Sequence, residues 1–238
     1  MISHRHQCVF IHIPKAAGQS IESVFVKANN LTWAERAPLL LKPNTNKLLG
    51  PPRLAHLKAS EYVDCGHISA ALFQQYFKFT FVRNPWARLV SEFNYRQQHG
   101  DVRYQCSFKK FLFERFPTAE LDDYLNAKDY YRHVISQWQF IYDENDNCLV
   151  DFVGKFENLQ QDFDYVQNQL GLPKVPLPHK NITHGKTARF KQSVFSLISK
   201  NKAKSHYSYY YDQESMNYVK TLYEKDIILF NYHFEDQK

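Results

Sequence analysis

Residues 10–20 read Phe-Ile-His-Ile-Pro-Lys-Ala-Ala-Gly-Gln-Ser, and this stretch decides the fold class. An apolar run over residues 8–13 leads into a turn of small residues, and a helical pattern begins near Ser20. Backbone N–H groups at a helix N-terminus bind anions, and Lys15 adds a mobile positive charge beside them. The stretch therefore predicts a strand, a phosphate-binding turn and a helix. It differs from the Walker A loop of kinases, because its lysine precedes the glycine, so we do not expect ATP–magnesium chemistry.

A second segment repeats this arrangement. Residues 78–93 read Lys-Phe-Thr-Phe-Val-Arg-Asn-Pro-Trp-Ala-Arg-Leu-Val-Ser-Glu-Phe, with Arg83 at the end of an apolar run and Ser91 in the helical pattern that follows. A guanidinium holds a phosphate through two parallel hydrogen bonds, each worth about 1.5–3 kcal/mol. We therefore expect a second phosphate contact here.

With both segments in view, the chain resembles the sulfotransferases that use 3′-phosphoadenosine 5′-phosphosulfate (PAPS). It is most similar to their carbohydrate branch, which includes heparan 2-O- and chondroitin-type enzymes. In that family the first loop holds the 5′-phosphosulfate and the pattern R-x-P-x-x-R-x-x-S holds the 3′-phosphate, matched here by Arg83, Pro85, Arg88 and Ser91. Residues 153–163 resemble the family's F-E-x-L segment, and residues 209–234 resemble its closing helix.

The resemblance implies a set of cofactor-binding residues. Lys15 would stabilise the charge that grows on the bridging oxygen of the leaving phosphate. A loop of the family closes over the nucleotide at the position of Lys180 and Lys186, although a solvated basic loop is an alternative. Arg88 is left out of the site, because an exposed helix arginine or a salt bridge is equally plausible. The cofactor-binding set is Lys15, Ala16, Ala17, Gly18, Gln19 (where relatives commonly have Thr), Ser20 (alternatively a plain helix N-cap), Arg83, Ser91 and Lys186.

Sulfuryl transfer also needs a base for the acceptor hydroxyl, and histidine suits this task near neutral pH. His67 lies in a segment that resembles a family segment ending Gly-His, in which the histidine is the catalytic base; a capping or structural role is the alternative. His133 and Gln137 resemble an H-x-x-x-Q segment on one helical face, where they would contact the acceptor or simply lie on the helix surface. His12 is expected to be a core histidine.

Strand patterns lie at residues 8–13, 62–65, 79–82 and 149–152, with helical patterns between them. This alternation predicts βαβ units and a largely parallel sheet. We expect one three-layer α/β/α domain over residues 1–238, related to P-loop nucleotide-binding folds. The remaining predicted segments are helices at 18–27, 86–98, 159–170 and 216–230, a mostly helical aromatic-rich segment at 107–142, and a loop at 174–189.

Composition narrows the classes of function. The chain has 238 residues, 44% of them hydrophobic, and a net charge of +6, which suits an anionic cofactor. We find no nucleic-acid signature, no convincing metal-ligand spacing, and no apolar run near the roughly 20 residues that cross a bilayer. The N-terminal residues lack a signal-peptide pattern, so we expect a cytoplasmic protein.

The combined prediction is PAPS-dependent O-sulfation by in-line displacement, without a metal, on an acceptor that is a carbohydrate. Sulfation of a small hydroxylated metabolite or lipid is the alternative within the enzyme class. A non-catalytic nucleotide-binding protein of the same fold is the alternative from another class. The sequence leaves the oligomeric state open.

Overall fold

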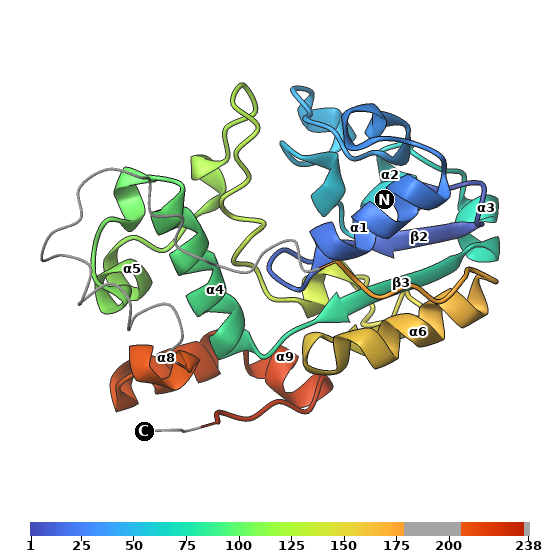
Figure 1. Ribbon diagram of the computed structural model, residues 1–238. Helices are drawn as coiled ribbons and strands as arrows, with labels where there is room; N and C mark the ends of the chain where they lie inside the picture. The colour runs from blue at the N-terminus through green and yellow to red at the C-terminus, as the bar shows by residue number, and fades with distance from the viewer. Residues whose placement is uncertain (179–205, 236–238) are drawn as a thin grey trace, which may run out of the picture.

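Two apolar runs form the centre of the sheet. β2 (Cys8–Ile11) and β3 (Phe77–Val82) are almost fully buried and pair in parallel, with Phe10 opposite Phe79. Branched and aromatic residues buried on both faces are typical of central parallel strands. The structure is a computed structural model that describes residues 1–178 and 206–235, and these two strands run through its middle (Figure 1).

Within the described residues the sheet has four strands in the order β1-β2-β3-β4. β4 (Phe152–Lys155) runs parallel to β3, whereas β1 (Ile2–Ser3) is a short antiparallel edge strand. Parallel neighbours need long crossover connections, and the segments between these strands contain helices. The prediction of a largely parallel α/β sheet is confirmed.

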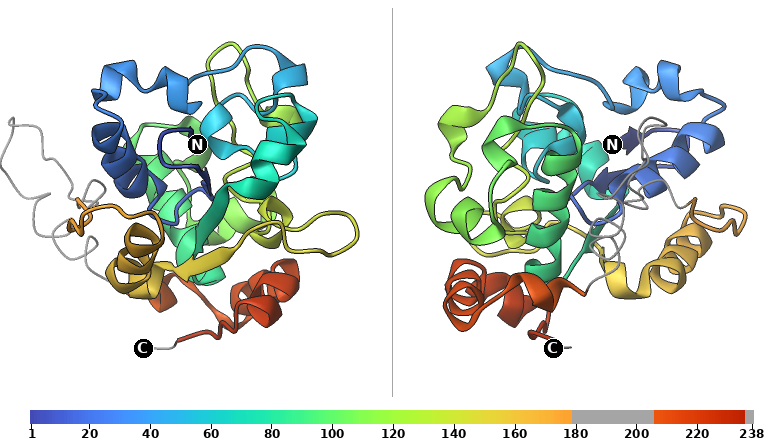
Figure 2. Two further views of the ribbon diagram at one scale, coloured as in Figure 1. Left: turned by 90° about the vertical axis from the view of Figure 1, so that its right-hand side faces the viewer. Right: turned by 60° about the vertical axis from the view of Figure 1, so that its left-hand side comes forward.

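Helices cover both faces of the sheet (Figures 1 and 2). On one face α1 and α6 pack against the strands, with Phe25 and Phe163 in the shared core. On the other face Tyr62 of α2 and Phe73 of α3 pack against Val9 and Ile11. The arrangement is three-layered, as predicted. The helix bounds are α1 Gly18–Ala28, α2 Glu61–Asp64, α3 Ala70–Gln75, α4 Pro85–Gln98, α5 Phe108–Glu114, α6 Leu159–Gln169, α8 Gln213–Leu222 and α9 Glu224–Leu229.

A third apolar cluster lies beyond the end of β3, where α4, α5 and α8 pack together around residues such as Phe93, Phe111 and Val219. Asn84 starts α4, because its side chain accepts hydrogen bonds from the N–H groups of Trp86 and Ala87. This cluster carries α4 across the end of the sheet, and α4 contributes several residues of the candidate site.

The predicted strand at residues 62–65 is wrong, because this segment forms α2. Tyr62 is fully buried and gave the segment its apolar appearance, but it faces the sheet from a helix. The fourth strand was placed too early, at residues 149–152, and the structure has it at Phe152–Lys155. In both cases a short apolar run did not decide the backbone conformation.

Residues 107–142 were predicted to be mostly helical, and this too is wrong. Only α5 and single 3-10 turns are regular there, and the buried aromatic residues lie partly on α5, as Phe108 and Phe111 do, and partly on irregular backbone, as Tyr130 does. The closing helix, predicted as one element over 216–230, is divided into α8 and α9 at Tyr223. The loop at 174–189 lies largely outside the described residues.

Candidate functional site

The turn after β2 has an unusual backbone. Lys15 and Ala17 have φ angles of 70° and 68°, a left-handed conformation that non-glycine residues rarely adopt. Ala17 is the N-cap of α1 and makes no side-chain cap, so the alternative reading of Ser20 as the helix N-cap is wrong. Such backbone strain persists only where the surroundings hold it, and it is concentrated at functional turns.

Lys15 lies at the centre of this turn with its Nζ 3.9 Å from the centre of the Tyr95 ring. Burial lowers the pKa of its amine to about 8, and the nearby carboxylate of Glu92 opposes this shift. The ammonium therefore keeps its charge near neutral pH while it is partly desolvated. A desolvated cation interacts strongly with an anion.

Gly18 faces the ring of His12. A Cβ atom at Gly18 would lie 2.0 Å from both Cδ2 and Nε2 of His12, which is far inside van der Waals contact. The glycine was expected to allow close approach of an anion; the structure adds a second reason, the close approach of this imidazole. Of the remaining loop residues, Ala16 is buried and Gln19 is exposed.

Arg83, at the end of β3, is held against the same turn. Its Nη1 donates to the backbone oxygen of Lys15 (3.2 Å), and its guanidinium lies 4.1 Å from the centre of the Phe156 ring. Burial lowers its pKa to about 10, so it stays charged. Its Nε has no hydrogen-bond partner among the described residues. Arg83 thus places a buried N–H donor near the turn that has no acceptor among the described residues. Ser91 lies on α4 and is half-buried.

Arg88 is not exposed, and it forms no salt bridge with any residue that the structure describes; these were the two roles weighed from the sequence. It is 1% exposed and donates to three backbone oxygens, those of Pro14 (3.0 Å), Ile135 (2.8 Å) and His133 (3.1 Å). One side chain therefore ties the first turn to the segment around residues 133–135.

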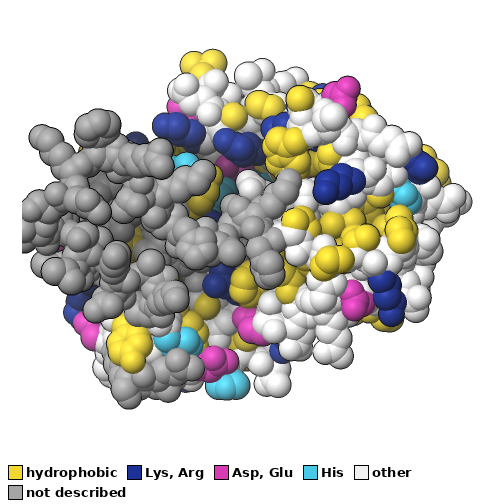
Figure 3. All heavy atoms as spheres, in the orientation of Figure 1, with side chains coloured by type: hydrophobic (Ala, Val, Ile, Leu, Met, Phe, Trp, Pro, Cys, Tyr) yellow, Lys and Arg dark blue, Asp and Glu magenta, His cyan; other side chains and the backbone are white. Residues whose placement is uncertain are grey.

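A cavity of about 340 Å³ opens beside the first turn, and this volume is within the range of small-molecule sites. His12 and Gln19 form the wall nearest to the turn. Figure 3 shows Lys and Arg side chains gathered in the upper part of one face of the molecule. The basic residues that line the cavity are Arg36, Lys42, Arg53, Arg96 and Lys128.

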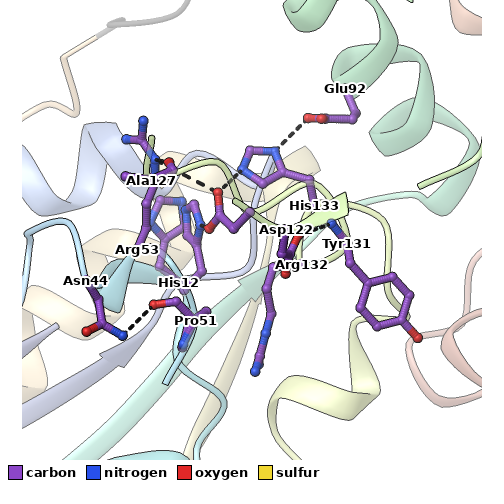
Figure 4. A network of polar contacts seen from close by, with 12 residues as sticks. His12, Asn44, Pro51, Arg53, Glu92, Asp122, Ala127, Tyr131, Arg132 and His133 are labelled. Atoms are coloured by element: carbon purple, nitrogen blue, oxygen red, sulfur yellow. Dashed lines mark hydrogen bonds and ion pairs between the residues drawn. The ribbon is translucent and has the colours of Figure 1, made fainter. Parts of the chain in front are cut away.

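Three buried histidines in the cavity wall are each paired with a buried carboxylate. Nδ1 of His12 is 2.6 Å from Glu22, Nδ1 of His133 is 2.7 Å from Glu92, and Nδ1 of His56 is hydrogen-bonded to Asp129. Figure 4 shows Glu92 on the side of the His133 ring that faces away from His12. We call these six residues the histidine–carboxylate cluster.

The rings of this cluster form a row. His12 and His56 meet edge to face at 4.7 Å between ring centres, and His56 and His133 meet likewise at 5.0 Å. Burial lowers the pKa of His56 to about 4, although Asp129 opposes this shift. Burial alone would raise the pKa of Asp129, but the facing histidines hold it well below its usual range. Near pH 7 His56 is therefore neutral, with an ionised carboxylate on Nδ1.

His56, Asp129 and His133 each offer an atom that a metal could bind, within 4.8 Å of one another. Their hydrogen bonds to each other and to Glu92 account for this closeness. We therefore treat them as an acid–base cluster and not as metal ligands, and the expectation of a metal-free site stays a prediction.

The structure does not bring His67 to this cavity. His67 is half-buried, and its Nε2 is hydrogen-bonded to the backbone oxygen of Leu49 (2.8 Å). His133 does reach the cavity, but Gln137 does not: it is fully buried and pairs with both backbone groups of Arg83 (2.8 Å each). The two lie on irregular backbone and not on one helical face. Lys180 and Lys186 lie outside the described residues.

Sequence reasoning missed His56 and Asp129. Asp129 precedes His133 by four residues, a spacing that could have drawn attention to it. His56 is one of eleven histidines and has no local pattern of its own. His12 was expected in the core; it is buried, but it also lines the cavity.

Comparison with known proteins identifies the family of this chain. Residues 1–233 match the model of the sulfotransferase family. Carbohydrate sulfotransferase 9 of Homo sapiens is 24% identical over 97% of this chain and 52% of its own length. Carbohydrate sulfotransferase 11 of Rattus norvegicus is 23% identical over 98% of this chain and 66% of its own length. An uncharacterized protein of Archaeoglobus fulgidus is 32% identical over 45% of this chain and 78% of its own.

The chain thus spans about half the length of the first of these relatives. No solved structure matches it significantly. Within the described residues no helix is both long enough and apolar enough to cross a membrane. Because the family match covers nearly the whole chain, both strand–turn–helix segments included, this protein belongs to the sulfotransferase family.

Proposed function

We propose that this protein transfers a sulfuryl group from PAPS to a hydroxyl of a carbohydrate by in-line displacement. The observation that carries this proposal is the pairing of His56 with Asp129 in a cavity that begins at the first turn. A base and an anion-binding turn in one cavity are what a transfer from a phosphosulfate to a hydroxyl requires.

In this proposal the two strand–turn–helix segments hold the donor. The turn from Lys15 to Ser20 binds the 5′-phosphosulfate through backbone N–H groups and the Lys15 ammonium. Arg83 and Ser91 bind the 3′-phosphate. This role is supported by the buried Nε of Arg83, which has no partner in the described part of the chain, because a buried donor needs an acceptor. Lys186, outside the described residues, stays in the proposed donor site on family resemblance alone.

We assign the general base to His56 in place of His67. Asp129 accepts from Nδ1 of His56, which leaves Nε2 unprotonated in the neutral ring. Nε2 takes the proton of the acceptor hydroxyl as the acceptor oxygen bonds to sulfur. The bond between sulfur and the bridging oxygen breaks, and its electron pair stays with the 5′-phosphate, whose charge Lys15 stabilises.

The basic and aromatic residues at the cavity suit a sugar acceptor. Trp33 lies in the lining with Arg36 4.6 Å from its ring centre, and Arg53 donates to the backbone oxygen of Ala127 (2.8 Å) at the same wall. Flat aromatic faces pack on sugar rings, and guanidinium groups bind hydroxyl or acidic substituents. The two relatives named as carbohydrate sulfotransferases support this acceptor class.

The base assignment is tested by comparing two alanine variants. We expect His56→Ala to lower kcat by roughly 10²–10⁴-fold, as loss of a general base does, with little change in PAPS affinity. His67→Ala is the matched control and should keep near-normal turnover. The opposite result, with His67→Ala inactive and His56→Ala active, would return the base to the position expected from the sequence.

The donor assignment is tested by calorimetric titration with 3′,5′-adenosine bisphosphate and, separately, with ATP and magnesium. We expect binding of the bisphosphate alone. Binding of ATP–magnesium alone would contradict the proposed donor and indicate phosphoryl transfer.

A further inference from the structure

The basic residues of the cavity differ in how deeply they are held. Five cationic side chains line it, against two carboxylates that are each already paired with a histidine. Lys42, Arg53 and Lys128 are exposed, whereas Arg96 is only 9% exposed. A buried cation in a cavity wall calls for a partner that an exposed cation does not need, because burial removes its hydration.

Glu92 accounts for only part of the Arg96 side chain. Nε of Arg96 donates to one oxygen of Glu92 (2.6 Å), which lies one helical turn earlier on α4. The other oxygen of Glu92 pairs with Nδ1 of His133 (2.7 Å). The ion pair therefore has a single hydrogen bond, and it is not the two-bond fork that arginine and a carboxylate frequently form.

Both terminal nitrogens of Arg96 lack a hydrogen-bond partner among the described residues. Nη2 is buried without an acceptor, and Nη1, which makes no hydrogen bond there either, is not buried. The guanidinium lies 4.4 Å from the centre of the Tyr130 ring, which stabilises its charge but offers it no oxygen. Because buried donors normally have acceptors, these two nitrogens indicate a ligand on the cavity side.

The charge of Arg96 favours an anionic ligand. Burial alone would lower the pKa of Arg96, but Glu92 raises it above its usual value, so the guanidinium stays charged. Charge-assisted hydrogen bonds are about twice as strong as neutral ones. A carboxylate or sulfate group would therefore satisfy this side chain better than a neutral hydroxyl.

Arg96 lies near the point of transfer but outside the first turn. Its guanidinium carbon is 5.8 Å from the centre of the Tyr95 ring, and Nζ of Lys15 is 3.9 Å from the same centre. Through Glu92, Arg96 is tied to the histidine–carboxylate cluster, which contains the proposed base. This position suits a group of the molecule beside the base, which is the acceptor.

We propose that Arg96 binds a carboxylate or sulfate group of the acceptor through Nη1, and that it makes this protein select an anionic carbohydrate. This inference rests on the proposed function, because the carbohydrate is the acceptor assigned there. Arg96 is then a specificity-determining residue. It holds the acceptor and takes no part in moving the sulfuryl group or the proton.

The test is a calorimetric titration, without a donor, with three hexasaccharide probes. The first alternates glucuronic acid with N-acetylgalactosamine, the second is its neutral, carboxyl-reduced form, and the third is the reduced form with sulfate esters on N-acetylgalactosamine. We expect the wild-type protein to bind an acidic probe roughly 10–100-fold more tightly than the neutral probe, the value of one charge-assisted hydrogen bond. The tighter of the two acidic probes identifies the group that Arg96 binds.

Two variants of the cavity separate Arg96 from general attraction by its positive charge. Arg96→Gln should remove most of the preference for the acidic probe and change binding of the neutral probe by less than about threefold. Lys128→Gln is the matched control, because it removes the same charge from an exposed side chain of the same cavity. It should keep the preference within about threefold of wild type.

Thermal melting verifies that each variant folds. If Arg96→Gln does not fold, Arg96→Lys replaces it, because its ammonium still pairs with Glu92. Arg96→Lys lacks the two terminal nitrogens of the guanidinium, so it should fold and still lose most of the preference.

The outcomes separate this inference from the proposed function. The inference is overturned if no acidic probe binds more tightly than the neutral one, or if Arg96→Gln and Lys128→Gln reduce the preference equally. It is also overturned if Arg96→Gln weakens binding of PAPS and not of the acidic probe, because the anion would then be the donor's. Selection of an acidic probe through Arg96 without binding of 3′,5′-adenosine bisphosphate would contradict the proposed donor and leave Arg96 as a carbohydrate-binding residue.

Discussion

The two strand–turn–helix segments and the histidine–carboxylate cluster are built in different ways, although Gln19 of the first segment and the three histidines of the cluster line the same cavity. In the segments, Lys15 to Ser20 and Arg83 to Ser91, the key residues lie within a few positions of one another on a strand end, a turn and the start of a helix. In the cluster, His56 pairs with a residue 73 positions away and Glu92 with one 41 positions away. The two segments can therefore be recognised from a local sequence pattern. The pairs of the cluster form only when distant parts of the chain fold together.

The largest effect is expected where the two regions are joined. Arg88→Met should lower the free energy of unfolding by about 3–5 kcal/mol, because three buried backbone oxygens lose a charged donor. Urea unfolding measures this. Arg115→Met is the matched control, since exposed Arg115 donates to a single backbone oxygen, and it should stay within about 0.5 kcal/mol of wild type. If both variants lost the same free energy of unfolding, the hydrogen bonds of Arg88 would not be what joins the two regions.

Acid should weaken the cluster before it affects the phosphate-binding segments. The folded pKa of His56 is about 4, below the usual 6.5, so the unfolded chain binds the proton first and stability falls with pH between these values. We expect a loss of about 2–4 kcal/mol from pH 7 to pH 4 from this residue. The depressed pKa of Asp129 adds a further loss at lower pH.

Urea unfolding at several pH values measures this dependence. His56→Gln should flatten the slope between pH 6.5 and pH 4, whereas His67→Gln should leave it unchanged. A slope that survives in His56→Gln would show that other groups control the acid sensitivity.

The phosphate-binding region is tested alone through Arg83. Arg83→Ala should weaken binding of 3′,5′-adenosine bisphosphate by roughly 10–100-fold, the value of one charge-assisted hydrogen bond. Binding of the analogue without the 3′-phosphate should change far less. Calorimetry with both nucleotides measures the difference, and equal weakening of the two would place the 3′-phosphate elsewhere.

The smallest effect is expected at the contact between the regions, Gly18 against His12. Gly18→Ala should cost about 1–3 kcal/mol of stability, because the new Cβ overlaps the imidazole. In a His12→Ala background the same change should cost much less. Gly154→Ala is the matched control: its Cβ would overlap the Phe81 ring, so its cost should be independent of His12. If Gly18→Ala lowered the stability as much in the His12→Ala background as in the wild-type protein, the proposed contact between Gly18 and the His12 ring would be contradicted.

Segments whose pattern depends on near neighbours were predicted well. The strand before Lys15, the helices that begin near Gly18 and Pro85, and the parallel sheet agree with the structure. The errors lie where burial was mistaken for a backbone type, as in residues 62–65 and 107–142. Aromatic side chains can be buried in the core whether their backbone is helix, strand or irregular. Composition alone therefore does not decide which of these three backbone types a segment adopts.

The candidate site divides in the same way. The sequence predicted the first turn, with Lys15 and Gly18, and the turn at the end of β3, with Arg83, because strand–turn–helix geometry is encoded in adjacent residues. His56 and Asp129 were not found, since nothing near either residue indicates the other. Gln137, expected at the acceptor, instead pairs with the backbone of Arg83, a contact between residues 54 positions apart.

The sequence by itself determined the class of fold, the two strand–turn–helix segments and, through their resemblance, the family. Turn geometry and helix starts depend on the preferences of a few consecutive residues, which a single chain displays directly. Only the tertiary structure decided which histidines face the cavity, which carboxylate each one meets, and why position 18 is a glycine. Those contacts depend on packing between distant segments, where burial fixes both the partner and the charge of each side chain.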